Sequence, residues 1–289
     1  MTVMITLEAT PDGAEHRSRA LAAGLLLTGL VVGAALLSLV WTPYDPTAIN
    51  VAGRLAAPSA AHWFGTDAYG RDVFSHVLAG AQSALAVALA AVGVGLAAGV
   101  PLGLLAAARR GWVDEVTMRA SDIVFAFPAL VTAVLIAALC GPGAVDAIAA
   151  IGLFNIPVFA KVTRAAAQGV WARDYTLAAR LAGKGGGRIS VEHVLPNIAG
   201  LLLVQATIQL SLGIIADAGL SFVGLGTQAP RPSWGRLLAD SQTLAGQAPW
   251  LVLFPGLAVL AAVLGFNLLG EGLRARLDLK RGLFARRGR

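Results

Sequence analysis

The sequence predicts an all-α membrane protein with six transmembrane helices. Of its 289 residues, 57% are hydrophobic and 13% are charged, and the mean hydropathy is +0.73. An average soluble domain carries about 25% charged residues, so this chain has roughly half that share. Five stretches run for 23 residues or more without Asp, Glu, Lys or Arg. A transmembrane helix needs about 20 mostly apolar residues, so each stretch is long enough to cross a bilayer.

The six expected spans follow from these stretches, from proline and glycine positions and from the charges between them. They are residues 20–41, 83–107, 120–140, 145–162, 195–217 and 250–270. The first is expected to be an uncleaved anchor, because it is longer than the apolar core of a secretory signal and no small-residue cleavage site precedes its exit at Trp41. Pro101 is expected to kink the second span, and Pro128 lies early in the third.

Charge decides whether the fourth span crosses. The charge-free run there, 147–160, has only 14 residues and contains Asn155 and Pro157. Basic residues flank both chain ends, and six more lie between Lys161 and Arg188. Cytoplasmic loops of membrane proteins carry an excess of Lys and Arg. With six spans, eighteen of the 22 basic residues face the cytoplasm, which agrees with this rule. The four on the outer side are Arg54, Arg71, Arg231 and Arg236.

This sidedness gives the domain organisation. We expect a cytoplasmic tail at 1–19, the first span at 20–41, an outer segment at 42–82, a core of five spans at 83–270 and a basic cytoplasmic tail at 271–289. The core contains a cytoplasmic inner loop at 163–195. Sidedness also explains the net charge of +6, so nucleic acid is not an expected partner. Glycine pairs with GxxxG spacing, at 29/33, 95/99 and 99/103, are expected to let helices pack closely.

Catalytic and cofactor motifs are scarce. One cysteine and four scattered histidines offer no metal cage. The run Gly183–Gly187 contains Lys184, but a Walker A loop needs a glycine where Ala178 stands and Ser or Thr where Gly185 stands. We therefore expect no catalytic residue, no metal and no nucleotide on this chain.

The inner loop is the first candidate site. Residues 175–182 favour a short helix, the run Gly183–Gly187 breaks it, and the chain resumes toward Pro196. A short helix with small residues and arginines suits docking by a soluble partner, although an ordinary solvated loop has a similar composition.

At this point the sequence resembles a known family. Ala178-Ala179, Gly183 and Leu195-Pro196 fit the spacing of the EAA loop of ABC importer permeases, with Leu177 in place of the usual Glu and His193 in place of Ile. The resemblance implies that this loop couples to ATPase subunits. The implied coupling residues are Tyr175, Leu177, Ala178, Ala179, Arg180, Gly183, Arg188, Leu195 and Pro196.

Two more stretches resemble the C-type permeases of dipeptide, oligopeptide and nickel importers. One is the outer signature, residues 62–73 (HWFGTDAYGRDV); the other joins 220–226 (LSFVGLG) to 232–235 (PSWG). The likeness covers residues 20–280. It implies a type I ABC importer permease fold in a bacterial inner membrane, with both termini cytoplasmic. It also implies a second permease subunit, two ATPases that hold ATP and Mg, and an external substrate-binding protein.

Polar residues in the fifth span suggest a path. Gln205, Gln209 and Asp217 lie on a broad face of this helix, and acids within spans usually face the bundle interior or a water-filled cavity. They form either a hydrated translocation path with Asp217 near its outer mouth, or an interfacial site in contact with water, or helix-to-helix hydrogen bonds. In the outer signature, the charges either pair with each other or contact the binding protein, and its glycines suggest tight turns. The outer candidates are Gly65, Thr66, Asp67, Gly70, Arg71 and Asp72.

The sequence therefore predicts the permease subunit of an ATP-driven importer of dipeptides or oligopeptides. One alternative in the same family is an importer of nickel or another metal chelate, for which outer His62 and His76 are the only ligand candidates. An alternative of another class is a stand-alone secondary transporter or channel, which would normally show more buried charge or an inverted repeat. A membrane enzyme would need an acid–base or metal constellation.

Overall fold

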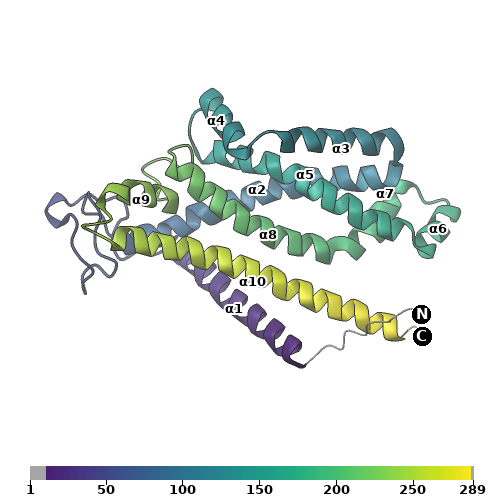
Figure 1. Cartoon of the computed structure of the whole chain (residues 1–289), viewed down its shortest axis with the longest axis horizontal. Coiled ribbons are helices and arrows are strands. Elements are labelled where there is room, and N and C mark those ends of the chain that lie inside the picture. Colours follow the sequence, from purple (N-terminus) through teal and green to yellow (C-terminus); the bar gives the residue numbers. More distant parts are fainter. Residues whose placement is uncertain (1–10, 288–289) are drawn as a thin grey trace, which may run out of the picture.

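A computed structural model describes residues 11–287, which form an elongated bundle of helices (Figure 1). Within those residues there is no strand, only an isolated β-bridge between Thr66 and Asp72. Five helices are long and apolar enough to cross a membrane, which confirms the all-α class. They are α1 (Pro11–Leu37), α2 (Val73–Arg109), α5 (Ala144–Trp171), α8 (Leu195–Phe222) and α10 (Trp250–Arg287).

The predicted third span, 120–140, is two helices rather than one. Helix α3 (Gly111–Ala126) and helix α4 (Ala129–Cys140) meet at an angle of 88° and make a sixth span only if they cross together. Phe127 and Pro128, between them, have extended backbones. A proline disfavours helical geometry in the residue before it, so the break falls where Pro128 places it.

Other predicted span boundaries differ from the observed ones: α1 ends at Leu37, α8 continues to Phe222 and α10 continues to Arg287. Helix α2 begins at Val73 rather than near residue 83, because the Asp72 carboxylate caps it by accepting from the Ser75 backbone N–H at 2.8 Å. Helix α5 continues to Trp171, so residues 163–171 of the predicted inner loop belong to this helix. The rest of that loop contains α6 (Asp174–Leu181), α7 (Gly186–Ile189) and a π-helical turn, Ser190–Val194. At the opposite end of the bundle lies α9 (Trp234–Ser241).

Glycines bring α2 and α5 into close contact. A Cβ at Gly95, Gly99 or Gly103 would lie only 2.4 to 2.5 Å from atoms of α5. The predicted packing role of this GxxxG run is confirmed. The pair at 29/33 has open space around it, so the packing prediction is wrong there within this chain.

Helices α1 and α10 pack side by side and antiparallel at one edge of the bundle (Figure 1). A Cβ at Gly24 would meet Leu269, and one at Gly265 would meet Thr28, so the backbones approach closely along their length. The start of α1 and the end of α10 therefore lie toward the end of the bundle that carries α6. We call the two ends of the molecule the α6 end and the α9 end.

Candidate functional site

Helix α6 protrudes at one end of the bundle, and glycine ends it. Gly183 has a φ of +82°, and its backbone N–H donates to the Arg180 carbonyl at 2.9 Å. The next N–H, of Lys184, donates to the Ala179 carbonyl at 3.1 Å. This pair of bonds is a Schellman motif, which favours glycine at its left-handed position. The short helix and its glycine stop, predicted from the sequence, are both observed.

One face of α6 anchors it to the bundle. Thr176 is fully buried, and its hydroxyl donates to the Trp171 and Arg173 carbonyls at 3.0 and 2.7 Å. Ala179 is 8% exposed and belongs to a buried cluster that also contains Trp171 and Ile189. Ala179 thus supports the helix from beneath and is covered, whereas a residue that contacts a partner has to be accessible.

The other face of α6 is uncovered and, apart from Asp174 in its first turn, apolar. Leu181 is 90% exposed, Leu177 is 49% exposed and Tyr175 is 46% exposed; Ala178 lies on this face too. Large apolar side chains gathered on a protruding helix are typical of an interaction site. We refer to Tyr175, Leu177, Ala178 and Leu181 as the α6 face.

Charged residues behind α6 are held by local partners. Glu192 accepts from Lys184 Nζ at 2.6 Å and from Arg188 Nε at 2.5 Å. The Arg180 guanidinium lies 4.8 Å from the centre of the Trp171 ring. Two of the predicted coupling residues are therefore held by contacts within the chain. Arg188 stabilises the turn after α6 through Glu192, and Arg180 holds α6 against Trp171 at the end of α5.

The EAA-like segment ends where α8 begins. Leu195 is half-buried against the cluster beneath α6, and Pro196 is exposed in the first turn of α8. Proline lacks a backbone N–H, and the π-helical turn lies just before it. His193, which replaces the expected Ile, has its ring 6.3 Å from that of Tyr175. The segment thus connects α6 to a long helix through continuous packing.

A cleft of about 440 Å³ opens between the α3–α4 pair, α5 and α8. Its walls are mostly apolar, with Phe125, Phe154 and Leu212 among the lining residues. Its polar groups are two amides: Gln209 Nε2 donates to Asn155 Oδ1 at 2.6 Å. Both side chains are buried, and Asn155 Nδ2 has no hydrogen-bond partner within residues 11–287.

Sequence reasoning selected Gln209 but not Asn155. A polar residue inside the apolar run 147–160 was the available signal, because such residues are expensive in a membrane and are often functional. Gln205 is half-buried and does not line the cleft. Asp217 is 2% exposed, lies outside the cleft lining, and has no hydrogen-bond partner for Oδ1 in the described part of the chain.

The outer signature folds into turns that precede α2. Asp67 accepts from the backbone N–H of Tyr69 and Arg71 at 2.8 and 2.9 Å, and from Arg71 Nε at 2.6 Å. Of the two predicted roles for these charges, pairing with each other is therefore observed. Asp72 caps α2 and also lies 2.9 Å from His62 Nδ1.

The other members of the signature close the same turns. Gly65 and Gly70 have φ values of +72° and +73°, and a Cβ at Gly70 would lie 1.8 Å from the Asn50 carbonyl oxygen. The Thr66 hydroxyl donates to the Gly53 carbonyl at 2.6 Å. These contacts give the glycines and the threonine a structural role.

The second outer motif attaches α9 to α2 and α8. Trp234 Nε1 donates to the Val77 carbonyl at 2.9 Å. A Cβ at Gly235 would lie 2.0 Å from the Ala218 carbonyl oxygen, and one at Gly226 would meet Ser221. The run 220–226 and the run 232–235 are thus packed against neighbouring elements.

Together these features define a class of protein. Among residues 11–287, no three His, Cys, Asp or Glu side chains are grouped so that they could hold a metal ion. The polar groups in the cleft are neutral amides, which can bind and orient a polar solute but are poor acids and bases. A bundle of apolar helices with a cleft among them and a short helix protruding at one end is the architecture of a membrane transport subunit.

Comparison with known proteins identifies the family. The chain belongs to the family described as binding-protein-dependent transport system inner membrane component, which matches residues 99–281. It is 40% identical to the dipeptide transport system permease protein DppC of Alkalihalophilus pseudofirmus, over 89% of this chain and 84% of that one. It is 38% identical to the glutathione transport system permease protein GsiD of Pectobacterium atrosepticum, over 90% and 87%. It is therefore an ABC importer permease.

A solved structure agrees on the fold. The chain resembles the MetNI methionine ABC transporter in an inward-facing crystal form with a TM-score of 0.59. The match covers 70% of this chain and 97% of that one, at 18% sequence identity.

Proposed function

We propose that this chain is the permease subunit of an ATP-driven importer of dipeptides or oligopeptides in a bacterial inner membrane. The names of its relatives support the substrate class: one is a dipeptide permease and another a glutathione permease. The observation that supports coupling to the ATPases is the α6 face, on which Leu181 is 90% exposed. The helix that bears this face is packed against the bundle through Ala179.

The assembly that we propose has four kinds of component. This chain and a second homologous permease subunit line the path, two cytoplasmic ATPases bind ATP and Mg, and an external binding protein delivers the peptide. The cluster beneath α6 contains residues of α2, α5, α6, α7 and α8. A displacement of α6 by the ATPases would therefore be transmitted to α5 and α8, which line the cleft. Such rigid-body transmission suits alternating access, in which helix bundles move around a site.

Reconstitution tests this proposal. The permease is co-expressed with the second permease and the two ATPases, purified, and placed in liposomes with ATP inside and peptide-loaded binding protein outside. ATP-dependent accumulation of a labelled dipeptide is expected. Accumulation of nickel but no peptide would contradict the substrate class, and peptide uptake by this chain alone would contradict the assembly.

We expect the α6 end, and with it both termini, to face the cytoplasm. Lys184 lies in the turn after α6 and is 31% exposed at its side chain. In a background without the single cysteine, Lys184→Cys should react with a membrane-impermeant maleimide only after cells are opened. An Arg54→Cys variant, in the exposed loop at the α9 end, is the matched control and should react in intact cells. The opposite pattern would reverse the proposed orientation.

Asp217 is proposed to act in the transport cycle. Its carboxylate is buried near the α9 end of α8, and Oδ1 has no internal hydrogen bond, so no described contact explains its presence. Asp217→Asn should lower peptide uptake severalfold and leave assembly with the partner subunits intact, since no ion pair is lost. Uptake assays and co-purification yields measure the two effects. Unchanged uptake and ATPase stimulation in the variant would show that Asp217 has no role in the transport cycle.

A further inference from the structure

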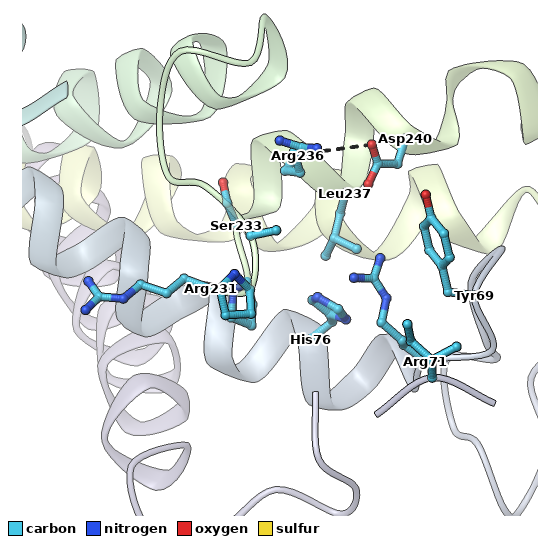
Figure 2. Close-up of a pocket in the computed structure, with 12 residues that line it drawn as sticks. Tyr69, Arg71, His76, Arg231, Ser233, Arg236, Leu237 and Asp240 are labelled. Atoms are coloured by element: carbon cyan, nitrogen blue, oxygen red, sulfur yellow. Dashed lines mark ion pairs between the residues drawn. The ribbon is translucent and has the colours of Figure 1, made fainter. Parts of the chain in front are cut away.

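A second hollow lies at the α9 end, far along the molecule from α6. It has a volume of about 230 Å³ and lies between the outer signature, the first turn of α2 and the segment that leads into α9 (Figure 2). We call it the outer recess. Its polar and charged lining includes Tyr69, Arg71, His76, Ser233, Arg236 and Asp240.

Two buried polar atoms of the outer recess have no partner. His76 is 4% exposed and Ser233 is 3% exposed. His76 Nδ1 and Ser233 Oγ make no hydrogen bond within residues 11–287. Burying a polar group without a hydrogen bond is costly, so such groups usually serve a ligand, a partner or water. They come from α2 and from the segment before α9, which are far apart in the sequence.

The charges around these atoms favour an anion. Three of the four arginines expected on the outer side line the recess. Arg71 is held by Asp67 at 2.6 Å and lies over the Tyr69 ring, whereas Arg236 reaches Asp240 only at 3.7 Å. Arg236 also donates to Gln228 Oε1, at 3.4 Å, so both of its contacts are long and it can exchange them for a closer partner.

Figure 2 shows how these side chains are directed. His76, Arg71 and Leu237 point toward one another, and the Arg236–Asp240 pair lies above them. Arg231 points away from this group, so it supplies charge at a distance. Among the groups that line the recess, an imidazole nitrogen of His76 and the Ser233 hydroxyl are therefore unpartnered within residues 11–287, and the Arg236 guanidinium is loosely held.

We propose that the outer recess binds a carboxylate side chain of the external substrate-binding protein. His76 Nδ1–H and the Ser233 hydroxyl donate to the carboxylate oxygens, and Arg236 supplies the opposite charge. This inference rests on the proposed function, which provides an external binding protein. It assigns to that protein an acidic residue that inserts between α2 and α9.

Size and position favour a protein side chain over the transported peptide. Pockets that enclose a whole small ligand are typically about 300–1,000 Å³, and the outer recess is smaller than that range. No residue lines both the outer recess and the intramembrane cleft, so the recess lies off the path formed there. An Asp or Glu side chain fits the space and leaves its backbone on the partner.

The test uses the full reconstituted complex and titrates it with peptide-loaded binding protein while ATPase activity is measured. Arg236→Glu should raise the half-maximal concentration of binding protein about tenfold, and the difference should shrink at high salt. Ser233→Ala should raise it severalfold without lowering the melting temperature, because the hydroxyl that is lost makes no internal bond. Arg54→Glu makes a like charge change on the exposed outer loop and should have no such effect.

A charge swap identifies the contact. An Asp or Glu of the binding protein, replaced by Lys, should restore the affinity lost in Arg236→Glu. If both recess variants keep the wild-type half-maximal concentration, the recess assignment is overturned and the proposed function stands. If loaded binding protein fails to stimulate the wild-type complex, the proposed function fails and the recess proposal fails with it. Calorimetric binding of free dipeptide that Ser233→Ala abolishes would assign the recess to substrate and overturn our choice of occupant.

Discussion

Replacing Leu181 by Asp is expected to detach the ATPase subunits while the permease remains folded. The side chain is 90% exposed, so its replacement removes almost no internal packing. In a groove of an ATPase, the same leucine would contribute about 2 kcal/mol through burial, and a carboxylate in its place would add a desolvation cost. A loss of 2–3 kcal/mol corresponds to a roughly 30- to 150-fold weaker association.

Pull-down of the ATPases by tagged permease, with peptide-stimulated hydrolysis in proteoliposomes, measures the effect of Leu181→Asp. Val51→Asp is the matched control, since Val51 is 66% exposed in a short 3₁₀ helix, Val51–Gly53, of the outer segment. It should leave attachment and coupling unchanged. Wild-type attachment and coupled uptake in Leu181→Asp would exclude the α6 face as the docking surface.

Two further variants separate docking from support. At Gly183 a new Cβ would meet no atom within 4 Å, so the penalty of Gly183→Val comes from the backbone φ of +82° and is of order 1–3 kcal/mol. That strain should misalign the turn and uncouple hydrolysis from uptake, with the spans intact.

Ala179→Asp would place a charge in the cluster with Trp171 and Ile189, and should also lower the melting temperature. Leu181→Asp and Ala179→Asp thus differ in stability even though both impair coupling.

The α6 region was predictable because its signals are local. A helix-favouring stretch, a glycine run and a proline specify a short helix, a stop and a new start within about twenty residues. Which face of the helix is covered depends on residues brought from α5 and α7. Ala178 and Ala179 are therefore indistinguishable in the sequence, whereas the structure exposes one and buries the other.

The spans show the same division. Long charge-free runs identify the long helices, but a count of charged residues does not show where a helix breaks or begins. It joined α3 and α4 into one span, although Pro128 already favoured a break at that point. It also began the second span late, because the capping bond from Asp72 to Ser75 has no hydropathy signature.

Sites built from distant segments could not be predicted. Asn155 and Gln209 meet because the glycines of α2 draw α5 close and α8 packs beside it. His76 and Ser233 line one recess because Trp234 bonds to Val77 and fixes the segment before α9 on α2. The sequence shows which residues are polar, but only the packed helices show which of them lie together when they are far apart along the chain.

The last prediction concerns the amide pair in the intramembrane cleft. Gln209→Leu is expected to lower peptide uptake about tenfold or more, because it deprives Asn155 Oδ1 of its donor and removes a polar group from an apolar path. Asn155 Nδ2 has no described partner, so the single variant also leaves a buried amide unsatisfied and should lower the melting temperature. Gln205→Leu is the matched control: it lies one turn away on α8 and does not line the cleft.

The double variant, Asn155→Leu with Gln209→Leu, distinguishes a transport role from a structural one. Replacing both partners of a buried hydrogen bond by apolar side chains of similar size is nearly neutral for stability, so the melting temperature should return toward that of the wild type. If the amides contact the peptide backbone as it passes, uptake should remain as low as in the single variant or fall further. Recovery of uptake together with stability would show instead that the pair only holds α5 to α8, and the cleft would then lose its assignment as the peptide path.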